Sequence, residues 1–383
     1  MLRARRRGPV IYLIGTAGHP NYGDELITAA WLRQYARTHP RAEVWLDTPR
    51  PGQAAVLFAG IHPGLRCVDT LFHACWNSPG HDPAETIAFG DRVLDTPRLI
   101  PREVSGVRNL ERVDLVHIIG GGYINKIWPR HLTLVGAAAG IATRYGARVA
   151  MTGAGLIPLV DGSSEPLGYA LSRFDVVDVR DESSYLAIQP RVPQATVTPD
   201  DALLEVGSDS LFGVTGAADT MLCIQSDQIQ CPLAEIADYV VRSLQAWGVD
   251  DSPITLVECL PPEDSEVVSL LSPHLPRLSL LPFAEMWRSG FPARSGQRWL
   301  STRFHPHLLA AAAGAWGVAI PVSRDYYENK HRSLVELGSG WALPDDLTDP
   351  VQPAQPAGQP FGGRLPEMRT AKHIVANQVL ALI

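Results

Sequence analysis

Residues 115–122 read LVHIIGGG, a short apolar run that ends in three consecutive glycines. A similar run, VIYLIG, occupies residues 10–15, and RVAMTGAG occupies residues 148–155. Helical segments are expected between these runs, at Glu25–His39 and at Leu132–Tyr145. Short apolar strands that alternate with helices predict a parallel sheet with right-handed crossovers. Ligands of such sheets bind beyond the carboxyl ends of the strands, which is where these glycines lie.

A second set of alternating segments follows the stretch PDD at residues 199–201. Strands are expected at 221–225, 254–258, 299–304 and 318–322, and helices at 233–247 and 307–316. We therefore expect an α/β chain with two facing Rossmann-like domains, residues 8–210 and 218–345, and an interdomain cleft. Residues 346–365, rich in Pro, Gln and Gly, are expected to form a linker. Residues 366–383 are expected to form an amphipathic helix that can reach back to the first domain.

Length, charge and cysteine content indicate a two-domain protein and argue against a nucleic-acid-binding protein. A chain of 383 residues is long enough for two domains, because single cores stop growing near about 250–300 residues. The net charge of −7 argues against a broad nucleic-acid-binding face. The five cysteines show no C-x-x-C pair and no matching histidine spacing, so we expect reduced thiols and no metal site.

No apolar run approaches the roughly 20 residues that span a bilayer. The basic N-terminus, with Arg3, Arg5, Arg6 and Arg7, fits either a solubilising end or contact with an acidic membrane surface. We expect a cytoplasmic protein with at most peripheral contact at the inner face of a membrane.

The stretch STRFHPH at residues 301–307 combines a fixed cation with a titratable imidazole. If the preceding strand extends to Phe304, Arg303 and His305 point to the same side, because side chains alternate along a strand. Pro306 is expected to open an apolar helix, whose positive N-terminus would lie beside the pair. Such a set suits an anion and a proton donor. The alternative is an arginine that pairs with an acid beside a histidine that fills space.

Two loops of the first domain carry polar or small residues at strand ends. In the first loop, Asn21 and Asp24 are placed to bond sugar hydroxyls, or else to form a turn and a helix cap. Gly120–Gly122 leave room for either a ligand or a crossing backbone. Trp128 suits stacking on a sugar ring, with a place in the core as the alternative.

Two further cations are candidates for binding an anion. Arg180 closes an apolar strand and is expected to face the cleft, with pairing to Asp181 or Glu182 as the alternative. Lys330 lies near the start of an expected helix, where a bound anion would offset the dipole, and a solvated lysine is the alternative.

Taken in order, these motifs resemble the polysaccharide pyruvyl transferase family from about residue 10 to residue 340. The resemblance implies a fold similar to GT-B glycosyltransferases. The family's motifs appear here as N-x-G-D-E at 21–25, a glycine triplet at 120–122, R-D-x-x-S at 180–184, R-x-H at 303–305 and Y-x-x-K at 327–330.

The resemblance also implies an activity: transfer of the pyruvyl group of phosphoenolpyruvate to two hydroxyls of a sugar in a cell-envelope glycan or glycolipid. A ketal forms and phosphate leaves. Phosphoenolpyruvate is then a co-substrate, the sugar acceptor is free or lipid-linked, and no cofactor is expected. The matching positions imply catalytic roles for His305 and Arg303, a donor site of Arg180, Arg303, Lys330, Gly121 and Gly122, and an acceptor site of Asn21, Asp24, Glu25, Trp128 and His131.

The residue types agree with that chemistry. A carboxylate and a phosphate suit two arginines and a lysine, and His305 is expected to act as the general acid. A nucleotide-sugar glycosyltransferase of the same architecture would also need a positive cleft. A non-catalytic glycan-binding protein on this fold is the third possibility, distinguished by failure to bind phosphoenolpyruvate.

Overall fold

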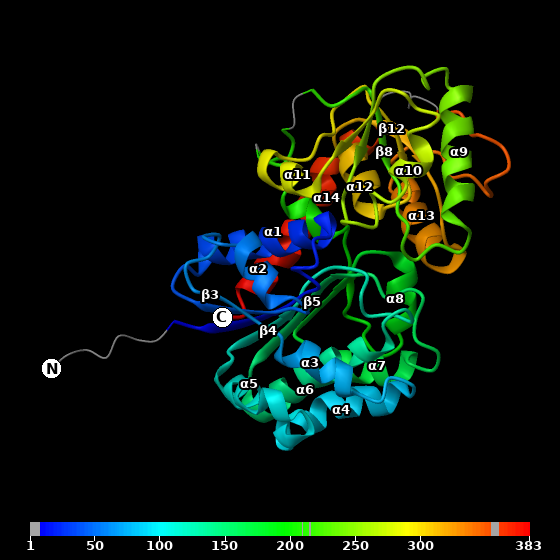
Figure 1. The fold of residues 1–383 in the computed structure, drawn as a ribbon. Coiled ribbons are helices and arrows are strands. Elements are labelled where there is room, and N and C mark those ends of the chain that lie inside the picture. Colours follow the sequence, from blue (N-terminus) through cyan, green and yellow to red (C-terminus); the bar gives the residue numbers. More distant parts are fainter. Residues whose placement is uncertain (1–7, 209, 214–215, 354–359) are drawn as a thin grey trace. The chain divides into compact units, whose positions relative to one another are not determined.

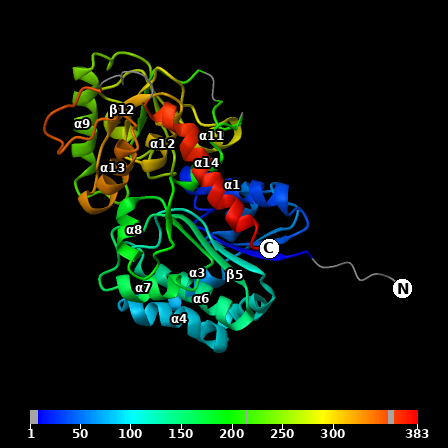
Figure 2. The same cartoon turned by 180° about the vertical axis from the view of Figure 1, so that it is seen from behind.

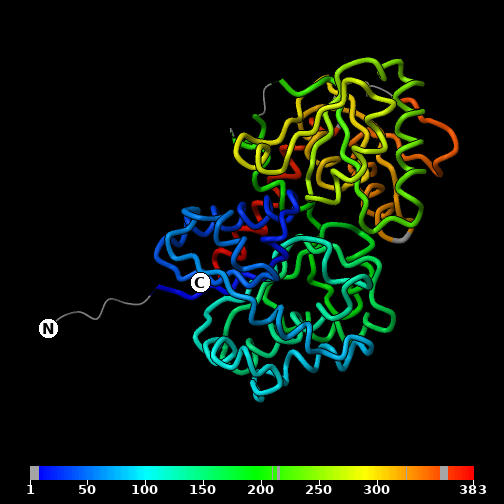
Figure 3. Tube along the Cα trace, viewed as in Figure 1, coloured from blue at the N-terminus to red at the C-terminus, as the bar shows by residue number. Residues whose placement is uncertain are grey.

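The computed structural model describes residues 8–208, 210–213, 216–353 and 360–383 (Figure 1). The arginine-rich stretch 1–7 and residues 354–359 of the expected linker lie outside the described residues. The chain divides into two compact units, whose chain path is traced in Figure 3. The N-terminal unit comprises the residues up to His19, Asp24–Leu204 and Met368–Ile383, and the C-terminal unit comprises Pro20–Gly23 and Glu205–Glu367.

The N-terminal unit is built on a parallel sheet in the order β3-β2-β1-β4-β5-β6-β7. Strands β1 and β4 lie at its centre and are completely buried, because helices cover both faces of a parallel sheet. Helices α3 to α7 lie on one side of it (Figure 1). The strands are β1 (Val10–Ile14), β2 (Glu43–Asp47), β3 (Leu65–Val68), β4 (Leu115–Ile118), β5 (Arg148–Ala154), β6 (Val176–Val179) and β7 (Thr196–Val197). The helices are α1 (Tyr22–Thr38), α2 (Pro51–Leu57), α3 (Thr70–Asn77), α4 (Pro83–Asp95), α5 (Val104–Asn109), α6 (Leu132–Tyr145), α7 (Ser164–Leu171) and α8 (Glu182–Ile188).

The C-terminal unit repeats the pattern with a parallel sheet in the order β10-β9-β8-β11-β12. Its strands are β8 (Thr220–Cys223), β9 (Ile254–Val257), β10 (Leu278–Leu281), β11 (Arg298–Ser301) and β12 (Trp316–Ala319). Its helices are α9 (Leu233–Ala246), α10 (Val268–Leu271), α11 (Phe283–Ser289), α12 (Phe304–Ala312) and α13 (Asn329–Glu336), with a π-helical segment at Arg324–Glu328. Two parallel sheets with alternating helices make two Rossmann-like domains, as expected from the sequence.

The boundary between β11 and α12 differs from the prediction. The strand ends at Ser301, and α12 begins at Phe304, so Pro306 is the third helical residue and does not open the helix. Ser301 Oγ bonds both the amide and the carbonyl of Arg303, which turns the chain directly after the strand. Proline is tolerated there because the first N–H groups of a helix have no intrahelical partner. The prediction that Arg303 and His305 share one side of a strand is therefore wrong.

The last helix, α14, spans Pro360–Leu380 and begins six residues before the predicted start at 366. Its part from Met368 onward belongs to the N-terminal unit (Figure 2). Among the described residues, none of the helices combines the length and the apolar character that crossing a membrane requires.

Candidate functional site

The first loop and the R-x-H motif meet in the C-terminal unit. The imidazole of His305 packs against the Cα of Gly23, and a Cβ at position 23 would overlap the ring. The neighbouring Tyr22 donates its amide hydrogen to the carbonyl of Cys259 at 2.8 Å. Glycine is needed here for close approach rather than for a positive φ.

The first loop itself forms a turn. Asn21 Oδ1 accepts a hydrogen bond from the amide of Gly23 at 3.3 Å, and α1 begins at Tyr22. Asp24 is therefore the third residue of the helix and does not cap it, contrary to that expectation. Asn21 lies in the C-terminal unit, whereas Asp24 and Glu25 lie in the N-terminal unit.

Arg303 is held by two carboxylates. Its Nε donates to Asp264 Oδ1 and its Nη2 donates to Asp227 Oδ1, both at 2.6 Å. Asp264 is completely buried and also accepts hydrogen bonds from the amides of Cys259 and Leu260, at 2.9 and 3.0 Å. Burial raises the pKa of Asp264, and the guanidinium of Arg303 acts in the opposite direction. The orientation of Arg303 is thus fixed, and its charge is shared with two acids.

Lys330 lies against the rings of two tyrosines. Its Nζ is 3.5 Å from the ring centroid of Tyr326 and 5.1 Å from that of Tyr327, a cation–π arrangement. Both rings come from the π-helical segment before α13, an irregularity often found at functional sites. Burial raises the pKa of Tyr327 to about 12, so its hydroxyl is protonated at neutral pH. The C-terminal unit therefore gathers the N-x-G, R-x-H and Y-x-x-K motifs.

The glycine triplet lies in the N-terminal unit and is crowded by protein atoms. A Cβ on Gly120 would come within 2.9 Å of the carboxylate of Asp201. Gly121 has a φ of +142°, and a Cβ there would lie 2.8 Å from the ring of Tyr123 and 3.7 Å from Asp24 Oδ1. Protein atoms therefore occupy the space that a side chain would need at positions 120 and 121.

Arg180 follows β6 and is buried. Its Nη1 donates to Asp200 Oδ2 at 3.1 Å, and a Cβ on Gly155 would lie 2.6 Å from its Nε. Asp181 approaches Nε at 4.0 Å, but its main bond is to the amide of Ser184, where it caps α8. The alternative expected from the sequence was an ion pair with Asp181 or Glu182. The structure shows a hydrogen-bonded ion pair with Asp200 and a longer contact with Asp181.

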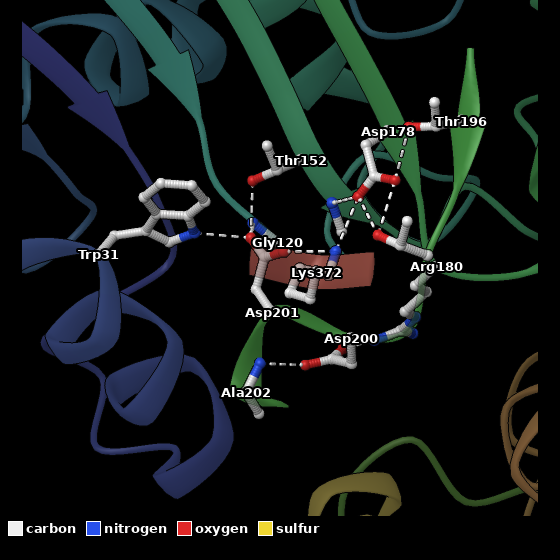
Figure 4. Close-up of polar contacts among 12 residues, drawn as sticks. Trp31, Gly120, Thr152, Asp178, Arg180, Thr196, Asp200, Asp201, Ala202 and Lys372 are labelled. Carbon is white, nitrogen blue, oxygen red and sulfur yellow. Dashed lines mark hydrogen bonds and ion pairs between the residues drawn. The ribbon is translucent and has the colours of Figure 1, made fainter. Parts of the chain in front are cut away.

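A buried charge network was missed by sequence reasoning (Figure 4). Lys372 Nζ, from α14, donates to Asp178 Oδ2 at 2.7 Å and to Asp201 Oδ1 at 2.8 Å. All three side chains are completely buried. Burial favours a lower pKa for Lys372, but the two carboxylates outweigh it and raise the pKa above its usual value. Asp201 Oδ2 also accepts from the amide of Gly120, so the network supports the glycine triplet.

Two residues assigned to the acceptor side are held as neutral groups. Burial and the neighbouring Asp24 raise the pKa of Glu25 to about 9. Its Oε1 accepts from the amide of Gly18 at 2.8 Å, and Oε2 has no hydrogen-bond partner among the described residues. Burial lowers the pKa of His131 to about 4. Its Nδ1 donates to the carbonyl of Tyr123 at 2.8 Å, and its ring stacks on half-buried Trp128.

Three residues of metal-ligand type, Cys223, Cys259 and Asp264, have ligand atoms within 4.8 Å of one another. Asp264 is already bonded to Arg303 and to two amides. Burial raises the pKa of the Cys223 thiol well above its usual value, which favours the protonated form. We assign no metal to this cluster.

A family model described as polysaccharide pyruvyl transferase matches residues 21–237. None of the curated proteins matches the chain. A solved structure of a proposed UDP-N-acetylglucosamine 2-epimerase from Listeria monocytogenes is 13% identical, with a TM-score of 0.52, over 98% of this chain and 91% of that one. The UDP-GlcNAc 2-epimerase from Neisseria meningitidis is 12% identical, with a TM-score of 0.50, over 96% and 94%.

At this level of identity the solved structures show the fold alone, and they confirm the predicted GT-B-like class of two Rossmann-like domains. Arg180 belongs to one unit, and Arg303, His305 and Lys330 belong to the other. A shared cleft for these four residues stays a prediction.

Proposed function

Because the chain belongs to the polysaccharide pyruvyl transferase family, we propose that it transfers the pyruvyl group of phosphoenolpyruvate to two hydroxyls of a sugar. The acceptor is part of a cell-envelope glycan or glycolipid, free or lipid-linked. The observation that carries the proposal is the packing of His305 on Gly23, which joins the first motif of the family pattern to the R-x-H motif.

In the proposed reaction His305 gives a proton to the methylene carbon of phosphoenolpyruvate, and positive charge develops at C2. One sugar hydroxyl forms a C–O bond to C2. The second hydroxyl forms another C–O bond there as the bond to the phosphate oxygen breaks. One hydroxyl proton restores the proton that His305 gave up, and the other goes to the departing phosphate. The products are therefore the ketal and inorganic phosphate. General acid catalysis of this kind contributes roughly 10²–10⁴-fold.

Arg303 is proposed to bind the donor through the guanidinium N–H groups that Asp264 and Asp227 do not engage. The group has five N–H donors, and Asp264 and Asp227 engage Nε and Nη2. The Nη1 side is then the one that faces a phosphate or carboxylate. Arg180, Lys330, Gly121 and Gly122 are proposed to complete the donor site.

The acceptor site is proposed to include Asn21, Asp24, Glu25, Trp128 and His131. Trp128 and His131 present parallel rings, an arrangement on which a sugar ring can stack. We propose that the reaction takes place in the cytoplasm, because an odd number of cysteines without metal-site spacing fits reduced thiols.

The test uses the full chain with phosphoenolpyruvate and candidate glycan acceptors. Phosphate release is followed together with the gain of the ketal mass on the acceptor. His305→Gln is expected to lower the rate by at least about 100-fold. Transfer by His305→Gln within a few-fold of the wild type would show that another group supplies the proton. Release of a nucleoside diphosphate from a sugar nucleotide would instead indicate a glycosyltransferase, and absence of phosphoenolpyruvate binding would indicate a glycan-binding protein.

A further inference from the structure

Two buried histidines connect the elements that carry the proposed proton donor and Lys330. His307, on α12, lies two residues after His305, and His331, on α13, directly follows Lys330. Their Nδ1 atoms are 3.1 Å apart, and both side chains are completely buried. None of the family motifs includes either histidine.

The partners of the two rings fix where each proton lies. His331 Nε2 is 3.1 Å from the carbonyl oxygen of Thr302, which accepts only, so Nε2 carries the hydrogen. In the neutral ring the Nδ1 of His331 is then an acceptor, and His307 Nδ1 must donate to it. His307 Nε2 is left as an acceptor, and the hydroxyl of Ser339, 2.9 Å away, donates to it.

Both rings are neutral in this arrangement. Burial lowers the pKa of His331 to about 4 and that of His307 well below its usual value. The result is a one-directional chain of hydrogen bonds from Ser339 through His307 and His331 to Thr302.

The end of this chain bears on Arg303. The carbonyl that His331 bonds belongs to the same peptide unit as the amide of Arg303, and that amide donates to Ser301 Oγ at 3.1 Å. The amide of Thr302 donates to the carbonyl of Cys223 at 2.9 Å, and its Oγ1 accepts from the amide of Gln225 at 2.9 Å. The peptide before Arg303 is thereby held from several sides, and α13 supplies one of the supports.

At the end of the hydrogen-bond chain remote from Thr302, the ring of His307 packs against an aromatic ring. It stacks on Trp341 with ring centroids 4.4 Å apart, and Trp341 Nε1 donates to the carbonyl of Ala315 at 3.2 Å. If either ring rotated or changed its tautomer, a buried polar atom would lose its hydrogen-bond partner. Leaving a buried polar atom without a partner costs more free energy than losing a hydrogen bond at the surface.

We propose that His307 and His331 are positioning residues, a rigid link that sets α12, which carries His305 and directly follows Arg303, against α13, which carries Lys330. The link determines the rate of pyruvyl transfer without touching the substrates. This inference rests on the proposed function for its kinetic consequence, but the link itself is a property of the C-terminal unit alone.

The kinetic test compares two substitutions at one position. His331→Gln keeps a donor near the place of Nε2 and so preserves the bond to Thr302. His331→Asn keeps a polar atom near the place of Nδ1 and loses that bond. We expect kcat to fall by about 10–100-fold in His331→Asn, the cost of a small misplacement of catalytic groups, and by much less in His331→Gln.

Ser339→Ala is the matched control, because it breaks the chain at the end remote from Arg303 and should leave kcat within about twofold. Equal losses of kcat in His331→Asn and His331→Gln, or an equal loss in Ser339→Ala, would show that the pair only fills the core. KM for phosphoenolpyruvate is expected to change less than kcat, since the link orients the reacting groups.

Nitrogen NMR of histidine-labelled wild-type protein tests the link without any activity. His307 is expected as the Nδ1–H tautomer and His331 as the Nε2–H tautomer, and the opposite assignment overturns the inference. Hydrogen exchange at the Arg303 amide should be faster in His331→Asn than in His331→Gln, and equal rates also overturn it. A wild type that shows these signals but no phosphoenolpyruvate-dependent transfer would refute the proposed function and leave the link in place.

Discussion

Replacement of Lys372 by methionine is expected to destabilise the N-terminal unit strongly. The ammonium lies 2.7 Å from Asp178 and 2.8 Å from Asp201, with all three side chains removed from water. Methionine keeps the length of the side chain and removes the charge, so two carboxylates stay buried without their cation. Breaking a buried ion pair by removing one partner costs about 3–5 kcal/mol.

The structure also limits this loss. Asp201 Oδ2 keeps its bonds from Trp31 Nε1 and Thr152 Oγ1, each at 2.7 Å, when the lysine is gone. Asp178 keeps the amide of Gly153 at 3.0 Å. We therefore expect a loss of about 4 kcal/mol at pH 7, against a typical total of about 5–15 kcal/mol. For a unit of this size the melting temperature should fall by about 10 °C.

The assay combines thermal unfolding with hydrogen exchange of peptides that cover residues 115–122 and 148–155, where the network bonds the backbone. Lys126→Met is the control, because Lys126 forms an exposed ion pair with Asp161 at 2.7 Å and should cost less than about 1 kcal/mol. Adding Asp201→Asn to Lys372→Met should recover part of the loss, since one buried charge is removed. A Lys372→Met protein within about 1 kcal/mol of the wild type would refute the reasoning.

Three further outcomes are expected. Gly23→Ala should push the imidazole of His305 away and lower pyruvyl transfer by about 100-fold, whereas Gly52→Ala, where a Cβ meets nothing within 4 Å, should leave transfer unchanged in the same phosphate-release assay. Glu25→Gln should become more stable than the wild type as pH rises from 5 to 8, by up to about 1.4 kcal/mol per pH unit. The reason is that the folded pKa of about 9 lies above the unfolded value, so the wild type loses stability through that window, and equal urea midpoints at both pH values would contradict it. Asp227→Asn should lower KM for phosphoenolpyruvate by up to about fivefold, because the partly exposed acid on Nη2 neutralises part of the charge that attracts the donor to Arg303. A raised KM would show that Asp227 helps to orient the arginine.

The alternation of strands and helices was predictable because the strands are buried on both faces. The run at β4 is buried at every position and apolar apart from His117, and such runs followed by glycine indicate a parallel sheet without reference to tertiary contacts. The end of β11 was not predictable in the same way. A single hydroxyl, Ser301 Oγ, turns the chain before Arg303, and hydrophobic periodicity carries no signal for one side-chain bond.

The partners of the cations were even less accessible to sequence reasoning. Lys372 lies 194 residues from Asp178 and 171 residues from Asp201 along the chain. A lysine in an amphipathic helix is usually solvated, and nothing in its neighbours marks it as buried. For Arg180 the adjacent acids were the natural candidates, but Asp181 is used to cap α8, which leaves the pairing to Asp200.

The family motifs identify which cationic residues to expect at the site, whereas residues outside the motifs determine the orientation of each cationic side chain. Asp264 holds Arg303, and Asp264 is itself fixed by the amides of Cys259 and Leu260. A guanidinium oriented in advance loses little freedom when an anion arrives, but it also shares its charge with the acid that orients it. A related chain that kept R-x-H and lost the acid at the position of Asp264 would retain the motif with a differently aimed arginine. Under the proposed function, Asp264 therefore indicates better than the motif itself whether Arg303 is oriented to bind the donor.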